Sequence, residues 1–195
     1  MHAKKPKRRK RNPKVVREDW PPGWTEEDER EFQEAGSHVY DKADWHIEGD
    51  FPKRLPKKQA FVHTGFFTGW LIAHRMISLK FLRECSRELS SAVDRFKRRA
   101  LTGPEVYEMW GGVLLDDMLT SPGNQFAQAY YENNQFVKDY QKLLARRLPS
   151  FYHVEDTWTN YEAIASCIDA RYEAWRCSHR KSKRRESPSL ALIRR

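Results

Sequence analysis

The last third of the chain carries the pattern that most constrains its fold. Between residues 158 and 177, aromatic and aliphatic side chains recur mostly at intervals of three or four positions, as they do on one face of an α-helix. A helix with such an apolar face has to pack against other elements. The sequence therefore predicts a helix over about residues 158–177, buried along the stripe Trp158, Tyr161, Ile164, Ala165, Ile168, Tyr172 and Trp175.

Helix start and stop signals divide most of the remaining chain into further helices. Thr102 and Glu105 have the spacing of a capping box, and Ser121 followed by Pro122 is typical of a helix start. No convincing alternating strand pattern is present. The predicted fold class is all-α, a compact bundle of about six helices with disordered basic tails, and the further helices span about 25–36, 59–76, 79–99, 102–111 and 121–147.

Two segments receive more specific predictions. Residues 40–58 contain Gly49, Pro52 and Pro56, so we expect an ordered loop or a short extended piece there and no helix. The helix at 59–76 has bulky side chains on both sides, which is typical of a central helix. Gly65 and Gly69 on that helix would let a neighbouring backbone come close.

Charge separates the ends of the chain from its body. The tails 1–17 and 180–195 carry +9 and +6 of a whole-chain charge of +9, which leaves −6 for residues 18–179. We therefore divide the chain into a basic disordered tail and hinge (1–22), a single acidic helical domain (23–179) and a basic C-terminal tail (180–195).

The positive charge of the two tails predicts a polyanionic partner. Clustered lysines and arginines bind phosphates without reading sequence, so RNA or DNA is the expected ligand, although such tails can also solubilise a protein or fold back on an acidic body. The residues with this assignment are Lys4, Lys5, Lys7, Arg8, Arg9, Lys10, Arg11, Lys183, Arg184 and Arg185.

Several classes of protein are disfavoured. Cys85, Cys167 and Cys177 form no metal-binding or disulfide-framework spacing, which fits a reducing compartment. The basic N-terminus lacks an apolar signal region, and the stretch 61–74 is too short and too polar to span a bilayer. No nucleotide or dinucleotide fingerprint is present. We expect a cytoplasmic protein without a membrane segment and without a cofactor or bound metal.

The stretch DWHIEGDFP at 44–52, followed by HTGFFTGWLI at 63–72, resembles an uncharacterised bacterial family of small helical proteins, a domain of unknown function. Its members read W-H-x-E-G-D-[FY]-P and then H-[TI]-G-x-[FL]-x-[GA]-W-L-I. The segments TGPE at 102–105, GNQFAQAYY at 123–131 and EDTWTNY at 155–161 extend the resemblance over about residues 39–177. The resemblance implies the helical fold and an intracellular bacterial setting, and no activity. The basic tails and the less polar segment 110–119 depart from the family pattern.

The first of these motifs also holds the candidate reactive groups. In an extended segment His46, Glu48 and Asp50 would share one face, and His63 from the central helix would join them in a metal-assisted or general acid/base site. Such groups equally form structural hydrogen-bond networks. A third reading is a partner-binding surface made of Trp45, His46, Glu48, Asp50 and Trp70.

Three functions follow from these alternatives. The first is a non-enzymatic interaction protein, immunity- or antitoxin-like by analogy, whose body binds a protein partner and whose tails add nucleic-acid affinity. The second is a hydrolase or nuclease that uses His46, Glu48, Asp50 and His63. The third is a nucleic-acid accessory protein that works through its tails alone.

Overall fold

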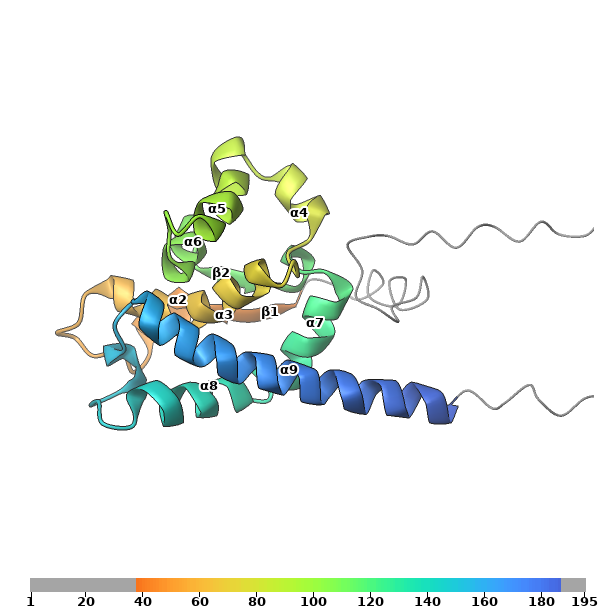
Figure 1. Ribbon diagram of the computed structural model, residues 1–195. Coiled ribbons are helices and arrows are strands. Elements are labelled where there is room, and N and C mark those ends of the chain that lie inside the picture. The colour runs from red at the N-terminus through yellow and green to blue at the C-terminus, as the bar shows by residue number, and fades with distance from the viewer. Residues whose placement is uncertain (1–37, 187–195) are drawn as a thin grey trace, which may run out of the picture.

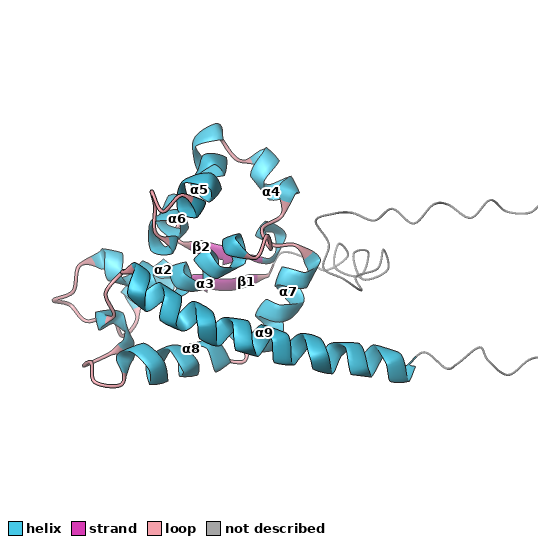
Figure 2. Ribbon diagram, viewed as in Figure 1, coloured by secondary structure: helices cyan, strands magenta, loops and turns pink. Residues whose placement is uncertain are grey.

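The computed structural model describes residues 38–186, with side chains described as far as His179. The predicted helix at 25–36, the N-terminal tail and the end of the C-terminal tail lie outside the described residues. Helices make up most of the described chain (Figures 1 and 2), so the all-α prediction is confirmed. No described helix is long and apolar enough to cross a membrane.

Helix α3 (Val62–Ala73) lies at the centre of the fold, and nearly all of its side chains are buried. It crosses α6 (Gly103–Met109) at very short range. A Cβ atom on Gly65 would lie 2.3 Å from the Cα of Pro104, and one on Gly103 would lie 2.2 Å from the carbonyl oxygen of Gly65. The prediction that glycine allows a neighbouring backbone to approach this helix is therefore confirmed at Gly65.

A short antiparallel sheet was not predicted. Strand β1 (Val39–Lys42) pairs with β2 (Val113–Leu115), and the register shifts between Val39 and Asp41. The strands are only four and three residues long, too short for a detectable alternation of apolar and polar side chains. The sheet lies beside α3 in Figure 2 and links the start of the described chain to the segment after α6.

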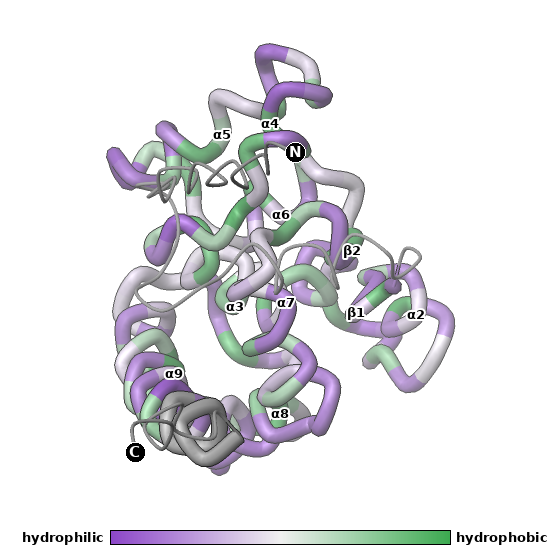
Figure 3. Tube along the Cα trace, turned by 90° about the vertical axis from the view of Figure 1, so that its right-hand side faces the viewer, coloured by the Kyte–Doolittle hydropathy of each residue, from purple (hydrophilic) through white to green (hydrophobic). Residues whose placement is uncertain are grey.

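Helix α9 (Trp158–Glu186) runs along the molecule beside α8 (Gln135–Tyr140) and packs on α3 (Figure 1). Figure 3 looks almost along its axis. Its predicted stripe packs on the hydrophobic core, with Ile164 and Ile168 fully buried and Tyr172 buried. The predicted end near Cys177 is wrong, because the helix continues to Glu186 into the basic C-terminal segment.

Two predicted helices are each divided. The helix expected at 79–99 is α4 (Leu79–Glu84) and α5 (Arg87–Lys97), because the Ser86 hydroxyl accepts the Leu89 amide as a new N-cap. The helix expected at 121–147 is α7 (Ser121–Ala127), a π-helical turn at 128–132, α8 and a second π-helical turn at 141–145. Asn134 breaks it with a left-handed backbone, φ 56°. The described residues therefore form eight α-helices in the part of the chain where five of the about six predicted helices fall.

The capping box predicted at the start of α6 is confirmed in full. The Thr102 hydroxyl accepts the Glu105 amide, and the Glu105 carboxylate accepts the Thr102 amide at 2.6 Å. The loop predicted at 40–58 needs correction, since Ala43–Glu48 form the helix α2. Glycine and the two prolines follow this helix and end it without preventing it.

Candidate metal centre

Asp41 is the anchor of a buried polar cluster. It lies on β1, opposite Leu114 of β2, and its side chain turns away from solvent. The backbone amide of Lys42 donates a 2.8 Å hydrogen bond to Oδ1 of Asp41, which fixes the carboxylate against its own strand. The strand pairing thus holds a carboxylate inside the fold, where it needs partners.

His46 approaches this carboxylate from α2. Because α2 starts directly after β1, its first turn folds His46 back over Asp41, and Nε2 lies 2.8 Å from Oδ1. The other ring nitrogen, Nδ1, lies 2.9 Å from the hydroxyl of Tyr152. The His46 side chain is 23% exposed, so it forms the solvent-facing side of the cluster.

His63 closes the cluster from the first turn of α3 and is buried. Its Nε2 lies 3.3 Å from Oδ2 of Asp41 and 3.2 Å from Nε2 of His46. Its Nδ1 is buried without a hydrogen-bond partner among the described residues. The ring therefore makes its polar contacts through Nε2, which faces Asp41 and His46.

Hydroxyl groups complete the shell around Asp41. Thr64, next to His63 on α3, donates a short hydrogen bond to Oδ2, and Tyr131 donates to the same oxygen at 2.7 Å. Burial, and then the charge of Asp41, raise the pKa of Tyr131 well above its usual value and that of Tyr152 to about 12. Both phenols therefore remain neutral hydrogen-bond donors at neutral pH.

The charge of the cluster is not balanced by a permanent cation. Burial alone would raise the pKa of Asp41, but hydrogen bonds from His46 and His63 hold it well below its usual range. Burial lowers the pKa of His63, which keeps that ring neutral. No lysine or arginine within the described part of the chain pairs with Asp41. A buried carboxylate of this kind is costly without a compensating positive charge.

The three side chains have the geometry of a metal-binding triad. Their ligand atoms all lie within 4.8 Å of one another. Two nitrogens bound at about 2.0–2.1 Å to one tetrahedral ion are about 3.3–3.4 Å apart, close to the spacing of the two Nε2 atoms. Two histidines and one carboxylate are a common ligand set for zinc and for non-haem iron. The contact between Nδ1 of His46 and the Tyr152 hydroxyl is the kind of outer contact that orients a histidine ligand, since a ring that binds an ion through Nε2 carries its proton on Nδ1 and donates it.

A metal-free acid/base role fits the same geometry less well. A histidine that takes a proton from a substrate needs a free ring nitrogen within reach of that substrate. Both ring nitrogens of His46 already have partners, and the free Nδ1 of His63 is buried. The cluster therefore lacks an accessible base, whereas a bound ion would use the same Nε2 atoms that now face each other.

Residues 39–154 match a family described as a domain of unknown function, DUF7832. The chain belongs to this family. The predicted resemblance to an uncharacterised domain family is thus confirmed. No curated protein and no solved structure matches the chain. The matched segment of the DUF7832 domain contains the triad and its partners Tyr131 and Tyr152.

The DUF7832 domain brings together only part of the predicted reactive set. His46 and His63 meet, as the metal-assisted or acid/base alternative required. Glu48 and Asp50 are exposed and are not members of the triad, because α2 replaces the extended segment that would have aligned them with His46. Asp41 was missed. A single aspartate in the stretch VYDK carries no local sign that it will meet two histidines, one of them far along the chain.

The predicted partner surface of the DUF7832 domain also needs one correction. Trp45 is 52% exposed, but Trp70 is completely buried, and its indole N–H donates to Asp169. Trp70 lies on the central helix α3, which is covered on all sides, and is not available to a partner. The exposed corner that remains consists of Trp45, Glu48 and Asp50, with His46 half-buried behind them.

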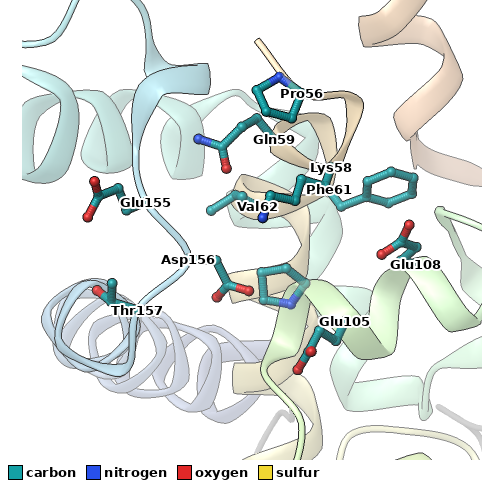
Figure 4. Close-up of a pocket in the computed structure, with 11 residues that line it drawn as sticks. Pro56, Lys58, Gln59, Phe61, Val62, Glu105, Glu108, Glu155, Asp156 and Thr157 are labelled. Atoms are coloured by element: carbon teal, nitrogen blue, oxygen red, sulfur yellow. The ribbon is translucent and has the colours of Figure 1, made fainter.

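A separate pocket of about 550 Å³ lies between the start of α3, the start of α6 and the loop before α9. Figure 4 shows carboxylates on several sides of it and Lys58 near its centre. Burial raises the pKa of Asp156, and one of its carboxylate oxygens is buried without a hydrogen-bond partner in the described part of the chain. The residues that line this pocket do not include Asp41, His46 or His63, so it is distinct from the triad.

Proposed function

We propose that this DUF7832 protein binds one divalent transition-metal ion on Asp41, His46 and His63. The observation that carries the proposal is the convergence of both Nε2 atoms on a buried carboxylate that has no lysine or arginine counter-ion among the described residues. Zinc is the simplest ion for this ligand set, and iron and manganese accept it as well. This proposal departs from our expectation, made from sequence, of a protein without a metal.

The arrangement of the ligands supports a catalytic metal site more than a structural metal site. Structural zinc sites usually have four protein ligands, whereas catalytic sites have three and keep a position for water. His46 is partly exposed, so solvent water would reach an ion held by these three side chains. A metal-bound water is a strong nucleophile near neutral pH, so the reaction class we propose is hydrolysis. Glu48 and Asp50 are not assigned as ligands.

A metal titration tests this proposal directly. Protein treated with a chelator and then dialysed is titrated with Zn²⁺ in a calorimeter, and one ion per chain should bind. Loss of a ligand in His46→Gln or His63→Gln should weaken binding by more than the ~10–100-fold that follows loss of an outer-shell partner. His74→Gln is the matched control, because His74 is an exposed histidine at the opposite end of α3 from His63 and contacts Asp169.

Either of two results would refute the metal site. One is the absence of zinc binding by the wild-type protein at micromolar concentrations. The other is equal binding by the wild-type protein and by His46→Gln and His63→Gln variants that have native circular dichroism. Manganese and iron(II), the latter under anaerobic conditions, are titrated in parallel, so that the test does not depend on the choice of zinc.

The exposure of Trp45 favours a second candidate function, the protein-interaction role predicted from the sequence. Tryptophan is enriched among the residues that carry most of the binding energy at interfaces, and Trp45 is 52% exposed, with Lys42 Nζ 5.5 Å from its ring centre. Trp45→Ala should abolish capture of a partner in pull-downs. Leu79→Ala, which removes an equally exposed apolar side chain elsewhere, should not.

The remaining predictions continue as proposals. Nucleic-acid binding by the tails rests on their charge alone, since the residues concerned lie outside the described side chains. A cytoplasmic location is supported by three cysteines that are all free. The immunity- or antitoxin-like role is supported by the acidic body and by the exposed corner at Trp45.

A further inference from the structure

Two arginines adopt a backbone conformation that usually requires glycine. Arg75 and Arg99 have φ values of 57° and 58°, in the left-handed region. Each follows the end of a helix, Arg75 after α3 and Arg99 after α5. Long side chains are disfavoured there because Cβ comes too close to the backbone. Asn134 is the remaining described non-glycine residue with positive φ, and asparagine tolerates this region.

The hydrogen bonds identify both positions as Schellman-type helix ends. After α3, the amides of Arg75 and Met76 donate to the carbonyls of Ile72 and Leu71. After α5, the amides of Arg99 and Ala100 donate to the carbonyls of Phe96 and Arg95 in the same pattern. Glycine is the usual residue at the left-handed position of this motif.

The same chain uses glycine at the equivalent position of a third helix. After α6, Gly111 has φ 79°, and its amide and that of Gly112 donate to the carbonyls of Glu108 and Tyr107. The strain at Arg75 and Arg99 is therefore not a general property of helix ends in this fold. Strained residues that persist in a fold cluster at functional sites.

Both arginines face one cavity. A hollow of about 430 Å³ lies between the ends of α3 and α5 and the start of α9. Its basic lining residues are Arg75, Lys97 and Arg99, and its aromatic ones are Phe96, Trp158 and Tyr161. Two helices that are separate in sequence thus each contribute a strained arginine to the same concave surface.

The charges of the cavity are only partly used within the protein. The Arg99 guanidinium stacks on Trp158, 4.7 Å from the ring centre, and pairs with the exposed Glu162. In the part of the chain that the structure describes, Arg75 and Lys97 have no side-chain ion pair. A bound anion would therefore meet two unpaired cations and a third held in place by an aromatic ring.

We propose that this cavity binds a nucleotide unit, with the phosphate on Arg75, Lys97 and Arg99 and the base beside Trp158 and Tyr161, whose rings also contact Arg99, Phe96 and each other. Clustered basic groups beside aromatic rings are the combination that proteins use for single-stranded nucleic acid and for nucleotides. The site lies on the body of the protein and is independent of the tails. It goes beyond the proposed metal function and does not rest on it.

The test compares arginine pairs of equal charge in the full-length protein. The cavity variant Arg75→Gly/Arg99→Gly removes two charges and the backbone strain. The control variant Arg54→Gly/Arg147→Gly removes two exposed arginines from turns elsewhere. Binding of a fluorescein-labelled 12-nucleotide single-stranded RNA is followed by anisotropy at several salt concentrations, and binding of AMP and ATP by calorimetry.

The cavity variant should bind at least ~10-fold more weakly than the control variant, and the slope of log K against log salt should fall by about one per lost phosphate contact. If AMP or ATP binds more weakly to the cavity variant than to the control variant, the ligand is a free nucleotide. If only the RNA binds more weakly to the cavity variant, the ligand is a single strand. Equal binding by both variants would overturn the proposal, as would the absence of binding to wild-type protein in every arm.

A stability measurement tests whether Arg75 is strained. Glycine is the favoured residue at this left-handed position, so Arg75→Gly should raise the melting temperature by about 2–4 °C. An unchanged or lower melting temperature would show that the arginine is not strained there. A single change that stabilises the fold and weakens binding is the result expected of a functional residue.

Discussion

The Nε2 atoms of His46 and His63 lie 3.2 Å apart, and both face the carboxylate of Asp41. Two ring nitrogens at this distance need a proton or a cation between them, because their lone pairs would otherwise face each other. Burial keeps His63 neutral, and the carboxylate remains charged because its pKa is held far below its usual range. A divalent ion would bridge the two Nε2 atoms and supply the positive charge that balances the Asp41 carboxylate.

Asp41 should also be the most sensitive polar position of the fold. Its carboxylate accepts hydrogen bonds from the Lys42 amide, His46, Thr64 and Tyr131. Asp41→Ala would leave several buried donors without an acceptor, and we expect a loss of about 3–5 kcal/mol in the free energy of unfolding. Urea denaturation followed by circular dichroism measures this. A loss below about 1 kcal/mol would show that the network is not structural.

Acid should destabilise the protein partly through Asp139. Burial alone would raise the pKa of this carboxylate, but a bidentate pair with Arg171 and bonds from Tyr130 and Gln135 lower it overall. A depressed pKa in the folded state contributes stability above the unfolded pKa of about 3.9 and loses it as the pH falls through the folded pKa. Thermal melts between pH 7 and pH 3 should therefore show a smaller acid-induced loss in Asp139→Asn than in the wild-type protein.

Asp44→Asn is the control for that comparison, because Asp44 is an exposed carboxylate on α2. Its melting temperature should change with pH in the same way as that of the wild-type protein, from pH 7 to pH 3. If Asp139→Asn also follows the wild-type curve, the pair with Arg171 does not contribute to acid sensitivity.

Asp156 should have the opposite pH dependence. Burial raises its pKa, the Thr102 hydroxyl bond opposes this, and Glu105 adds to the increase. A raised pKa stabilises the fold below the unfolded value of about 3.9, and this contribution disappears as the pH rises through the folded pKa. Asp156→Asn keeps an acceptor for Thr102 without the charge. Its melting temperature should be higher than that of the wild-type protein at pH 7 and equal to it at pH 4. A lower melting temperature than wild type at pH 7 would contradict a raised pKa for Asp156.

The crossing of α3 and α6 should not tolerate a methyl group. In Gly65→Ala the new Cβ would lie 2.3 Å from a backbone atom of Pro104, which cannot move without shifting α6. We expect a destabilisation of about 1–3 kcal/mol or more. Gly69→Ala should cost less, since its closest contacts are ring atoms of Phe96 and Tyr161 at 3.0–3.1 Å. Equal stability of the two variants in urea would contradict the close packing described for Gly65.

Features with a local signature could be predicted from the sequence. The capping box at Thr102 and Glu105 depends on residues three positions apart, and the stripe of α9 depends on a regular spacing along one helix. The close approach at Gly65 followed from a missing side chain on a crowded helix. The break at Asn134 also had a local sign, two consecutive asparagines that tolerate left-handed backbone, which our helix prediction passed over.

The candidate site could be predicted only in part, because it depends on tertiary pairing. His46 and His63 were named as candidates, but their contact needs β1 to pair with β2 and α2 to turn back over the sheet. Asp41 lies just before the motif and has no local feature that separates it from a surface aspartate. Trp70 was assigned to a surface because periodicity alone does not distinguish a helix that is covered on all sides from one that is covered on one side.

The metal content of the protein tests the central claim most directly. Full-length protein, expressed in medium containing trace zinc, iron and manganese and purified without chelators or a polyhistidine tag, is analysed by inductively coupled plasma mass spectrometry beside His63→Gln and His74→Gln. The account predicts close to one transition-metal ion per chain in the wild-type protein and in His74→Gln, and a large loss in His63→Gln. A wild-type protein that carries no metal and takes none up on titration would contradict it.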